Sequence, residues 1–207
     1  MRVLLADDHS ILREGVKSVL NALDQNAVVD EASKGQDAIA MARANQYDLI
    51  LLDISLPDIN GLEVLQRIKN SGSSASVAFL SLHPEGQYAS RAFSMGAVGY
   101  INKNASFDEL KGALEKLMKG GKYVSSSYAE KIAFGDDPAS LPHQKLSDRE
   151  LQVMLHIAKG ASLSEIADKL CIADKSVSTY RTRVMEKMHL KNNAEITIYA
   201  MKMGLIL

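Results

Sequence analysis

Short apolar runs alternate with amphipathic segments between residues 1 and 122. Uninterrupted apolar runs, typical of strands buried on both faces, occur at residues 3–6, 27–29, 49–52, 77–80 and 98–101. Apolar residues repeat with helical spacing at residues 11–23, 38–42, 61–70 and 106–119. Because parallel strands need crossover connections, this alternation predicts an α/β fold with one five-stranded parallel sheet covered on both faces.

A linker-like composition follows Gly120-Gly121. Residues 121–145 are rich in Gly, Asp and Pro, which favour loops, although residues 127–134 are compatible with a short helix. The remaining residues of the chain show helical patterns only. We therefore expect a first domain at residues 1–122, a linker at residues 123–142 and a second domain at residues 143–207.

Two serines mark helix starts in the second domain. Ser147 and Ser162 each stand three residues before a glutamate, which is the capping-box pattern. Helices are expected at residues 147–159, 163–170, 174–188 and 193–203. The second and third are joined by a tight turn, so the pattern predicts an all-α, four-helix domain that contains a helix-turn-helix.

Composition narrows the function classes. The chain has 24 Lys+Arg and 25 Asp+Glu, but residues 143–207 alone carry ten basic and seven acidic side chains, which hints at a nucleic-acid-facing end. One cysteine, Cys171, excludes an intrachain disulfide and indicates a reducing, cytoplasmic location. No apolar run approaches the ~18 residues of a membrane span, and the early carboxylates argue against a signal peptide, so no membrane partner is expected.

Three carboxylates stand at the expected carboxyl ends of strands. Asp7 and Asp8 follow the first run, and Asp53 follows the third. In a flavodoxin-like sheet of order 2-1-3-4-5 these two strands are neighbours, so the carboxylates should converge at the ligand-binding edge. Crowded carboxylates require a cation, and these oxygen ligands suit Mg²⁺ or Mn²⁺.

Ser81 and Lys103 follow the last two runs and should reach the same edge. A carboxylate nucleophile, a metal, a hydroxyl and an ammonium together indicate a site that accepts a phosphoryl group. Taken singly, each acid is more typical of a structural role such as helix capping, and the combination favours function. His9 is expected to be an exposed residue near this pocket.

These residues resemble a known family. Asp7-Asp8-His9, the run from Leu51 to Gly61 around Asp53, Leu80-Ser81 and the run from Gly96 to Lys103 resemble a CheY-like response-regulator receiver. Leu146 to Glu150 and Glu165-Ile166-Ala167 resemble the LuxR/FixJ-type helix-turn-helix. The chain as a whole resembles the NarL/FixJ (LuxR-type) family of two-component response regulators.

The resemblance implies roles for single residues. Asp53 resembles the phosphoacceptor, and Asp7, Asp8, Asp53 and the Ser55 carbonyl resemble the ligands of Mg²⁺ or Mn²⁺. Ser81, Tyr100 and Lys103 resemble the switch hydroxyl, the switch aromatic and the phosphoryl-binding lysine. A sensor histidine kinase would then phosphorylate Asp53 and so gate homodimerisation and DNA binding, without the protein being a turnover enzyme.

One face of the expected helix at 174–188 suits double-stranded DNA. Val177, Val184 and Met188 form its apolar stripe, and the opposite face carries cations and hydroxyls. The candidate DNA-binding residues are Lys175, Ser178, Thr179, Thr182 and Arg183. Arg181 lies beside the stripe, where an internal pair with Glu165 or another carboxylate and a phosphate contact are equally compatible. A possible dimer surface comprises Ile196, Tyr199 and Met203.

Three other functions remain open from the sequence. A DNA-binding regulator whose receiver no longer needs phosphate is opposed by the intact acidic set. A Mg²⁺-dependent phosphohydrolase would need a second acid two residues after Asp53, where Ser55 stands. An adaptor that acts by protein contacts alone would not bind DNA through residues 143–207.

Overall fold

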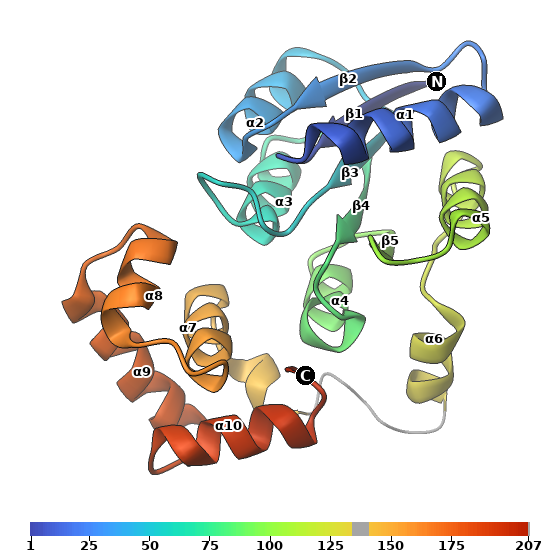
Figure 1. The fold of residues 1–207 in the computed structure, drawn as a ribbon. Helices are drawn as coiled ribbons and strands as arrows, with labels where there is room; N and C mark the ends of the chain where they lie inside the picture. The colour runs from blue at the N-terminus through green and yellow to red at the C-terminus, as the bar shows by residue number, and fades with distance from the viewer. Residues whose placement is uncertain (134–140, 207) are drawn as a thin grey trace. The chain divides into compact units, whose positions relative to one another are not determined.

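The computed structural model describes residues 1–133 and 141–206 of the chain. The chain divides into two compact units, Met1–Phe134 and Gly135–Leu207 (Figure 1). Each unit has its own buried apolar core. The exact limits of the linker expected at residues 123–142 stay a prediction, and residues 134–140 of it lie outside the described residues.

The first unit contains the predicted five-stranded parallel sheet (Figure 1). Its strands lie in the order β2-β1-β3-β4-β5, the flavodoxin-like order that the sequence predicts. Their bounds are β1 (Arg2–Ala6), β2 (Val28–Ala32), β3 (Leu49–Leu52), β4 (Ser76–Ser81) and β5 (Gly99–Asn102). Ala6 pairs with Leu52 in the register, so the residues that follow β1 and β3 are neighbours.

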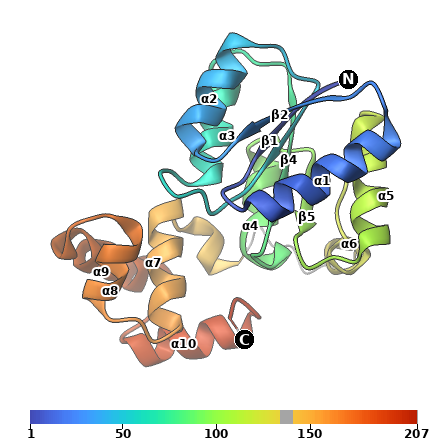
Figure 2. The same cartoon turned by 45° about the horizontal axis from the view of Figure 1, so that its top comes forward.

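Helices cover both faces of the sheet (Figure 2). They are α1 (Ser10–Leu23), α2 (Gly35–Ala44), α3 (Gly61–Asn70), α4 (Glu85–Ser94) and α5 (Phe107–Met118). Leu20 of α1 and Leu114 of α5 share a fully buried cluster with Leu5 and Leu51 of the strands. Because strand side chains alternate between faces, Leu4 and Ile50 lie on the opposite face, which α2 and α3 cover.

The chain stays on the first unit after α5. Tyr100 of β5 donates its backbone N–H to the Tyr123 carbonyl (3.1 Å), which adds one parallel bridge at the edge of the sheet. The short helix considered for this segment is present as α6 (Ser126–Ala133). Tyr128 of α6 is buried, and its ring centroid lies 6.3 Å from that of Phe93 in α4. The segment after α5 is therefore packed onto α4 and β5.

Helices alone form the described part of the second unit. They are η2, a 3₁₀ helix (Pro142–Lys145), α7 (Asp148–Ala158), α8 (Leu163–Leu170), α9 (Asp174–Met188) and α10 (Asn193–Lys202). Both capping boxes predicted for this unit are confirmed, because Ser147 and Ser162 each exchange two hydrogen bonds with the glutamate three residues later. Cys171 adopts a left-handed conformation (φ 51°) that turns the chain from α8 into α9. No helix in the described ranges is both long and apolar enough to cross a bilayer.

Candidate functional site

Asp7 and Asp53 lie side by side where β1 and β3 end. The pairing of the two strands continues for one residue, because Asp53 donates its backbone N–H to the Ala6 carbonyl (2.9 Å). The two acids are only 1% and 2% exposed. Asp8 is exposed, and ligand atoms of Asp7, Asp8, His9 and Asp53 all lie within 4.8 Å of one another. The structure thus brings together the three carboxylates that the sequence predicts to converge.

Lys103 is buried between the two inner carboxylates. Its Nζ lies 2.6 Å from Asp7 Oδ2 and 2.8 Å from Asp53 Oδ2, and its side chain is 3% exposed. The backbone N–H of Lys103 donates to the Ser81 carbonyl (2.9 Å), which holds the lysine at the carboxyl ends of β4 and β5. One ammonium therefore faces two buried carboxylates.

Opposing effects act on the pKa of Asp53. Burial raises the pKa of Asp53, Lys103 opposes this shift through a hydrogen bond and its charge, and Asp7 adds to it. The other carboxylate oxygen, Asp53 Oδ1, is buried and has no hydrogen-bond partner within residues 1–133 and 141–206. A buried, unpaired carboxylate oxygen beside two more acids fits the oxygen donor set of a hard divalent cation.

A turn after β4 connects Ser81 with Tyr100. The Ser81 side chain is fully buried, and its Oγ accepts the backbone N–H of His83 (3.2 Å). Tyr100 is also fully buried, and its hydroxyl donates to the His83 carbonyl (2.9 Å). Burial raises the pKa of Tyr100, so the phenol stays a proton donor. The Ser55 hydroxyl lies 2.8 Å from Nε2 of the same histidine, which brings the loop after β3 to this turn.

Two further residues fix the loop that carries Asp53. Gly61 donates its backbone N–H to the Ile54 carbonyl (2.9 Å), and a Cβ at Gly61 would lie 2.1 Å from the Asp53 carbonyl oxygen. Asp58 accepts the backbone N–H groups of Gly35 (2.7 Å) and Gln36 (2.9 Å) and so caps α2. The sequence indicates only a Pro-Asp turn at Asp58. Its partner Gly35 lies 23 residues away, so nothing near Asp58 in the sequence signals this helix cap.

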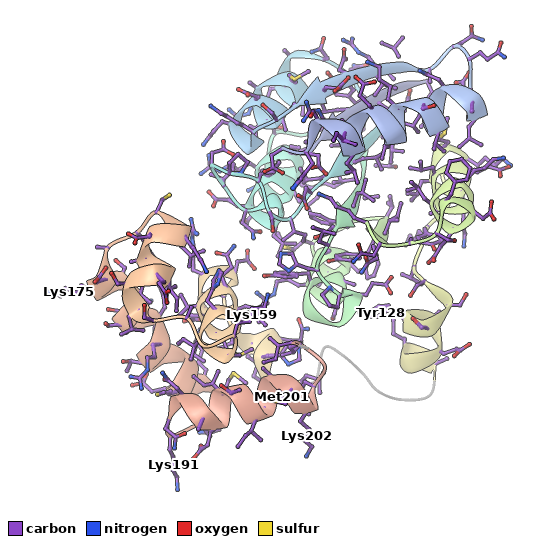
Figure 3. All side chains as sticks on the ribbon, viewed as in Figure 1. Tyr128, Lys159, Lys175, Lys191, Met201 and Lys202 are labelled. Carbon is purple, nitrogen blue, oxygen red and sulfur yellow. The ribbon has the colours of Figure 1, made fainter. Side chains whose placement is uncertain are left out.

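The predicted nucleic-acid face is exposed in the second unit. Every candidate on α9 is solvent-exposed, while Val177, Val184 and Met188 form the buried stripe. Figure 3 shows the Lys175 side chain pointing away from the helices of its unit. The hydroxyls of Thr179 and Thr182 donate to carbonyls one turn earlier in α9, at 2.9 and 3.1 Å. The proton of each hydroxyl is therefore used within the helix.

Two family descriptions cover most of the chain. Residues 3–115 match the response regulator receiver domain, and residues 144–200 match the bacterial regulatory proteins of the luxR family. Response regulator UvrY of Escherichia coli (strain K12) is 35% identical across 99% of this chain and 95% of its own length. The chain belongs to the NarL/FixJ family of two-component response regulators. Response regulator GacA of Pseudomonas aeruginosa is 32% identical to it across 100% of this chain and 98% of its own length.

This response regulator also resembles solved structures of RcsB from Salmonella enterica serovar Typhimurium. RcsB bound to promoter rprA in the presence of phosphomimetic BeF3⁻ has a TM-score of 0.69 and 25% identity, over 96% of this chain and 97% of that one. RcsB bound to promoter P1flhDC gives a TM-score of 0.60 and 26% identity over the same shares. The receiver and the LuxR-type helical domain are thus confirmed as the fold of this regulator of transcription.

Helix α10 of the response regulator corrects one sequence prediction. Ile196 is fully buried in the core of its own unit, so it cannot lie on a dimer surface. Tyr199 is partly buried, and its hydroxyl lies 2.9 Å from Nδ1 of the buried His143. The exposed apolar side chains of α10 are instead Ile198 and Met201, at 65% and 60%, with Met201 labelled in Figure 3.

Arg181 of the response regulator makes an internal contact of an unforeseen kind. Its Nε donates to Asn193 Oδ1 (2.7 Å) at the start of α10, rather than to Glu165 or another carboxylate. An ion pair also connects α9 with α7, because Lys187 Nζ lies 2.7 Å from the buried Glu150 of α7. Burial raises the pKa of Glu150, but its hydrogen bonds with Lys187 and Ser147 together lower it.

Proposed function

We propose that this response regulator is phosphorylated on Asp53 by a partner histidine kinase, and that the modification gates dimerisation and sequence-specific DNA binding. The observation that carries the proposal is the buried, unpaired Oδ1 of Asp53 beside Lys103 and two further acids. The kinase donor and the DNA target both belong to the cytoplasm, where we place the protein.

The chemistry follows from the residues around Asp53. An Asp53 oxygen attacks the phosphorus of a phosphohistidine, forms the P–O bond of an acyl phosphate and releases the histidine nitrogen as the P–N bond breaks. Lys103 stays beside the carboxylate and stabilises the added negative charge. Mg²⁺ or Mn²⁺, held by Asp7, Asp8, Asp53 and the Ser55 carbonyl, would supply further charge neutralisation. Asp53 holds one phosphoryl group at a time, and water later releases it as inorganic phosphate and restores the carboxylate; we propose that the protein acts as a switch and not as a turnover enzyme.

The signal leaves the site through the turn after β4. A phosphoryl group on Asp53 offers new acceptors to the Ser81 hydroxyl, which then moves from the His83 N–H. The Tyr100 hydroxyl donates to the carbonyl of the same histidine, so Ser81 and Tyr100 are both hydrogen-bonded to one turn. Glu85 continues this turn into α4 and bonds the Ser125 hydroxyl and backbone N–H ahead of α6. A shift of the turn therefore reaches the segment that leads to the DNA-binding domain.

The DNA contact uses the exposed face of α9. Lys175 and Arg183 suit phosphates, and the hydroxyls of Ser178, Thr179 and Thr182 suit phosphates or base edges. A dimer places two such helices on a repeated or palindromic site. We assign Ile198 and Met201 of α10 to the dimer surface together with the partly exposed Tyr199 and Met203, because they carry its outward apolar area.

The test compares wild type with Asp53→Asn, and with Asp108→Asn as a matched control at an exposed aspartate of α5. Acetyl phosphate with Mg²⁺ should label wild type and the control once, on the Asp53 peptide, and leave Asp53→Asn unlabelled. Sedimentation and DNA binding at one stated salt concentration should change with labelling in the first two proteins only. Unchanged DNA binding and assembly in labelled wild type would refute gating, and turnover of small phosphate esters would favour a phosphohydrolase.

The DNA face has its own test. Arg183→Ala should weaken operator binding and reduce the slope of log affinity against log salt by about 1. Lys202→Ala removes an exposed cation of α10 that lies off the α9 face and should leave that slope unchanged. An equal effect of the two substitutions would argue against the assigned face.

A further inference from the structure

His9 places an imidazole nitrogen among the acids of the phosphoacceptor site. Its Nδ1 lies 2.7 Å from Asp8 Oδ1 and 3.1 Å from Asp7 Oδ1. The His9 side chain is 58% exposed, so one side of the cluster is open to solvent. With Asp53, the potential ligand atoms lie within 4.8 Å of one another.

These separations match those of neighbouring ligands on one ion. Two donor atoms at about 2.1 Å from a metal and at right angles to each other lie about 3 Å apart. The Nδ1 distances to the two aspartates bracket this value. The unpaired Asp53 Oδ1 supplies an independent sign that the cluster is arranged for a cation.

The backbone holds His9 in this position. Its N–H donates to Asp7 Oδ1 (2.9 Å), and Arg13 Nη1 donates to the Asp7 carbonyl (2.6 Å), so the turn before α1 is fixed from both ends. His9 is the N-cap residue of α1, although its side chain makes no capping bond there. The imidazole is therefore directed to the acids and not to the helix.

We propose that His9 Nδ1 is an additional ligand of the divalent cation, and that it gives this response regulator a preference for Mn²⁺ over Mg²⁺. Imidazole nitrogen is a ligand for first-row transition metals, of which Mn²⁺ binds it most weakly, whereas the harder Mg²⁺ favours oxygen ligands still more strongly than Mn²⁺ does. The inference rests on the proposed cation site beside Asp53. It adds a selectivity that oxygen ligands alone would not provide.

The experiment measures metal binding directly on the full-length apoprotein. Mn²⁺ binding is titrated by electron paramagnetic resonance, and Mg²⁺ binding is measured by competition with Mn²⁺. Pulsed electron paramagnetic resonance detects nitrogen bound to Mn²⁺ as a modulation of the electron spin echo. In wild type we expect the modulation that is typical of an imidazole nitrogen. In His9→Asn, which keeps a good N-cap residue and replaces nitrogen by oxygen, we expect no modulation and about tenfold weaker Mn²⁺ binding, with Mg²⁺ affinity changed less than about twofold.

His83→Gln is the matched control, because it removes the other imidazole that contacts a residue of the site. The nitrogen modulation should persist in this variant. Thermal melts of both variants show whether they are folded, and His9→Ala repeats the test without a new donor. Modulation that is absent in wild type, or retained in folded His9→Asn, would overturn the inference and leave His9 as a hydrogen-bond partner of the acids.

The same samples separate this inference from the proposed function. Asp53 labelling by acetyl phosphate with Mg²⁺ and a normal Mg²⁺ affinity, without nitrogen coordination of Mn²⁺, would reject only the role of His9. Failure to bind either cation together with failure to label Asp53 would reject the proposed function as well.

Discussion

Lys103→Met replaces a buried ammonium with an apolar side chain of similar length. Lys103 Nζ faces Asp7 at 2.6 Å and Asp53 at 2.8 Å, and at an effective dielectric constant of about 20 each pair attracts by about 6 kcal/mol. Relaxation and protonation reduce what is measured, and loss of one partner from a buried ion pair costs about 3–5 kcal/mol. We expect the first unit to lose about 4 kcal/mol of unfolding free energy at pH 7.

The destabilisation by Lys103→Met should depend on pH in a defined direction. The pKa of Asp53 is already raised by burial, and without Lys103 it should rise further. Since protonated Asp53 carries no charge that needs a partner, the destabilisation should shrink as the pH falls through this raised pKa. For the same reason, Lys103→Met should cost less in an Asp53→Asn background than in wild type.

The assay is urea unfolding, from pH 7 towards pH 5, of wild type, Lys103→Met, Asp53→Asn and the double variant. Hydrogen exchange of the β1 and β3 amides follows the unfolding. These amides report the first unit alone. A Lys103→Met protein as stable as wild type at pH 7 would contradict this role of the ion pairs. A loss that is the same at every pH and in the Asp53→Asn background would contradict it equally.

Three further predictions concern other residues of the two units. Gly61→Ala places a Cβ against the Asp53 carbonyl oxygen, so it should cost about 3 kcal/mol in denaturant unfolding and abolish acetyl-phosphate labelling. Glu150→Gln weakens the tie to Lys187 and one capping box, so thermal melts of the second unit should show a loss of about 2 kcal/mol and operator gel shifts a weaker complex. Burial alone would raise the pKa of Asp58, but its backbone hydrogen bonds lower it, so this aspartate stabilises α2 above its unfolded pKa and ceases to do so as the pH falls through its folded pKa. Asp58→Asn should therefore destabilise the first unit by about 1 kcal/mol at pH 7 and progressively less in acid, measured by urea unfolding, and an equal loss at all pH values would contradict this assignment.

The acidic cluster was predictable because topology fixes it. Asp7 and Asp53 follow apolar runs, and parallel strands end at one edge, so their meeting needs no knowledge of side-chain packing. Lys103 and Ser81 reach the same edge for the same reason. The partner of Asp58 could not be predicted, because a side chain that caps a helix beginning 23 residues earlier in the chain has no periodic signature.

Helix α4 shows a different limit. No helix was assigned between β4 and β5, because Glu85–Ser94 contains Gly86 and two serines, and its buried residues include small alanines. Ala89 and Ala92 are fully buried. The segment is amphipathic, but small alanines on its buried side stand out little as an apolar stripe when the sequence is considered alone.

Helices α9 and α10 differ in how far the sequence alone fixes which side of the helix is buried. Helix α9 has one apolar stripe, so the opposite side must face solvent and its exposure follows from the period of 3.6 residues. In α10, Ile196 and Ala200 are buried while Ile198 and Met201 are exposed, so apolar residues occur on more than one side. Periodicity cannot orient such a helix, because either side satisfies the pattern, and only packing against the rest of the second unit decides between them. The same property makes the outward side of α10 suitable for a partner, since Ile198 and Met201 expose apolar area that α7 and η2 do not cover.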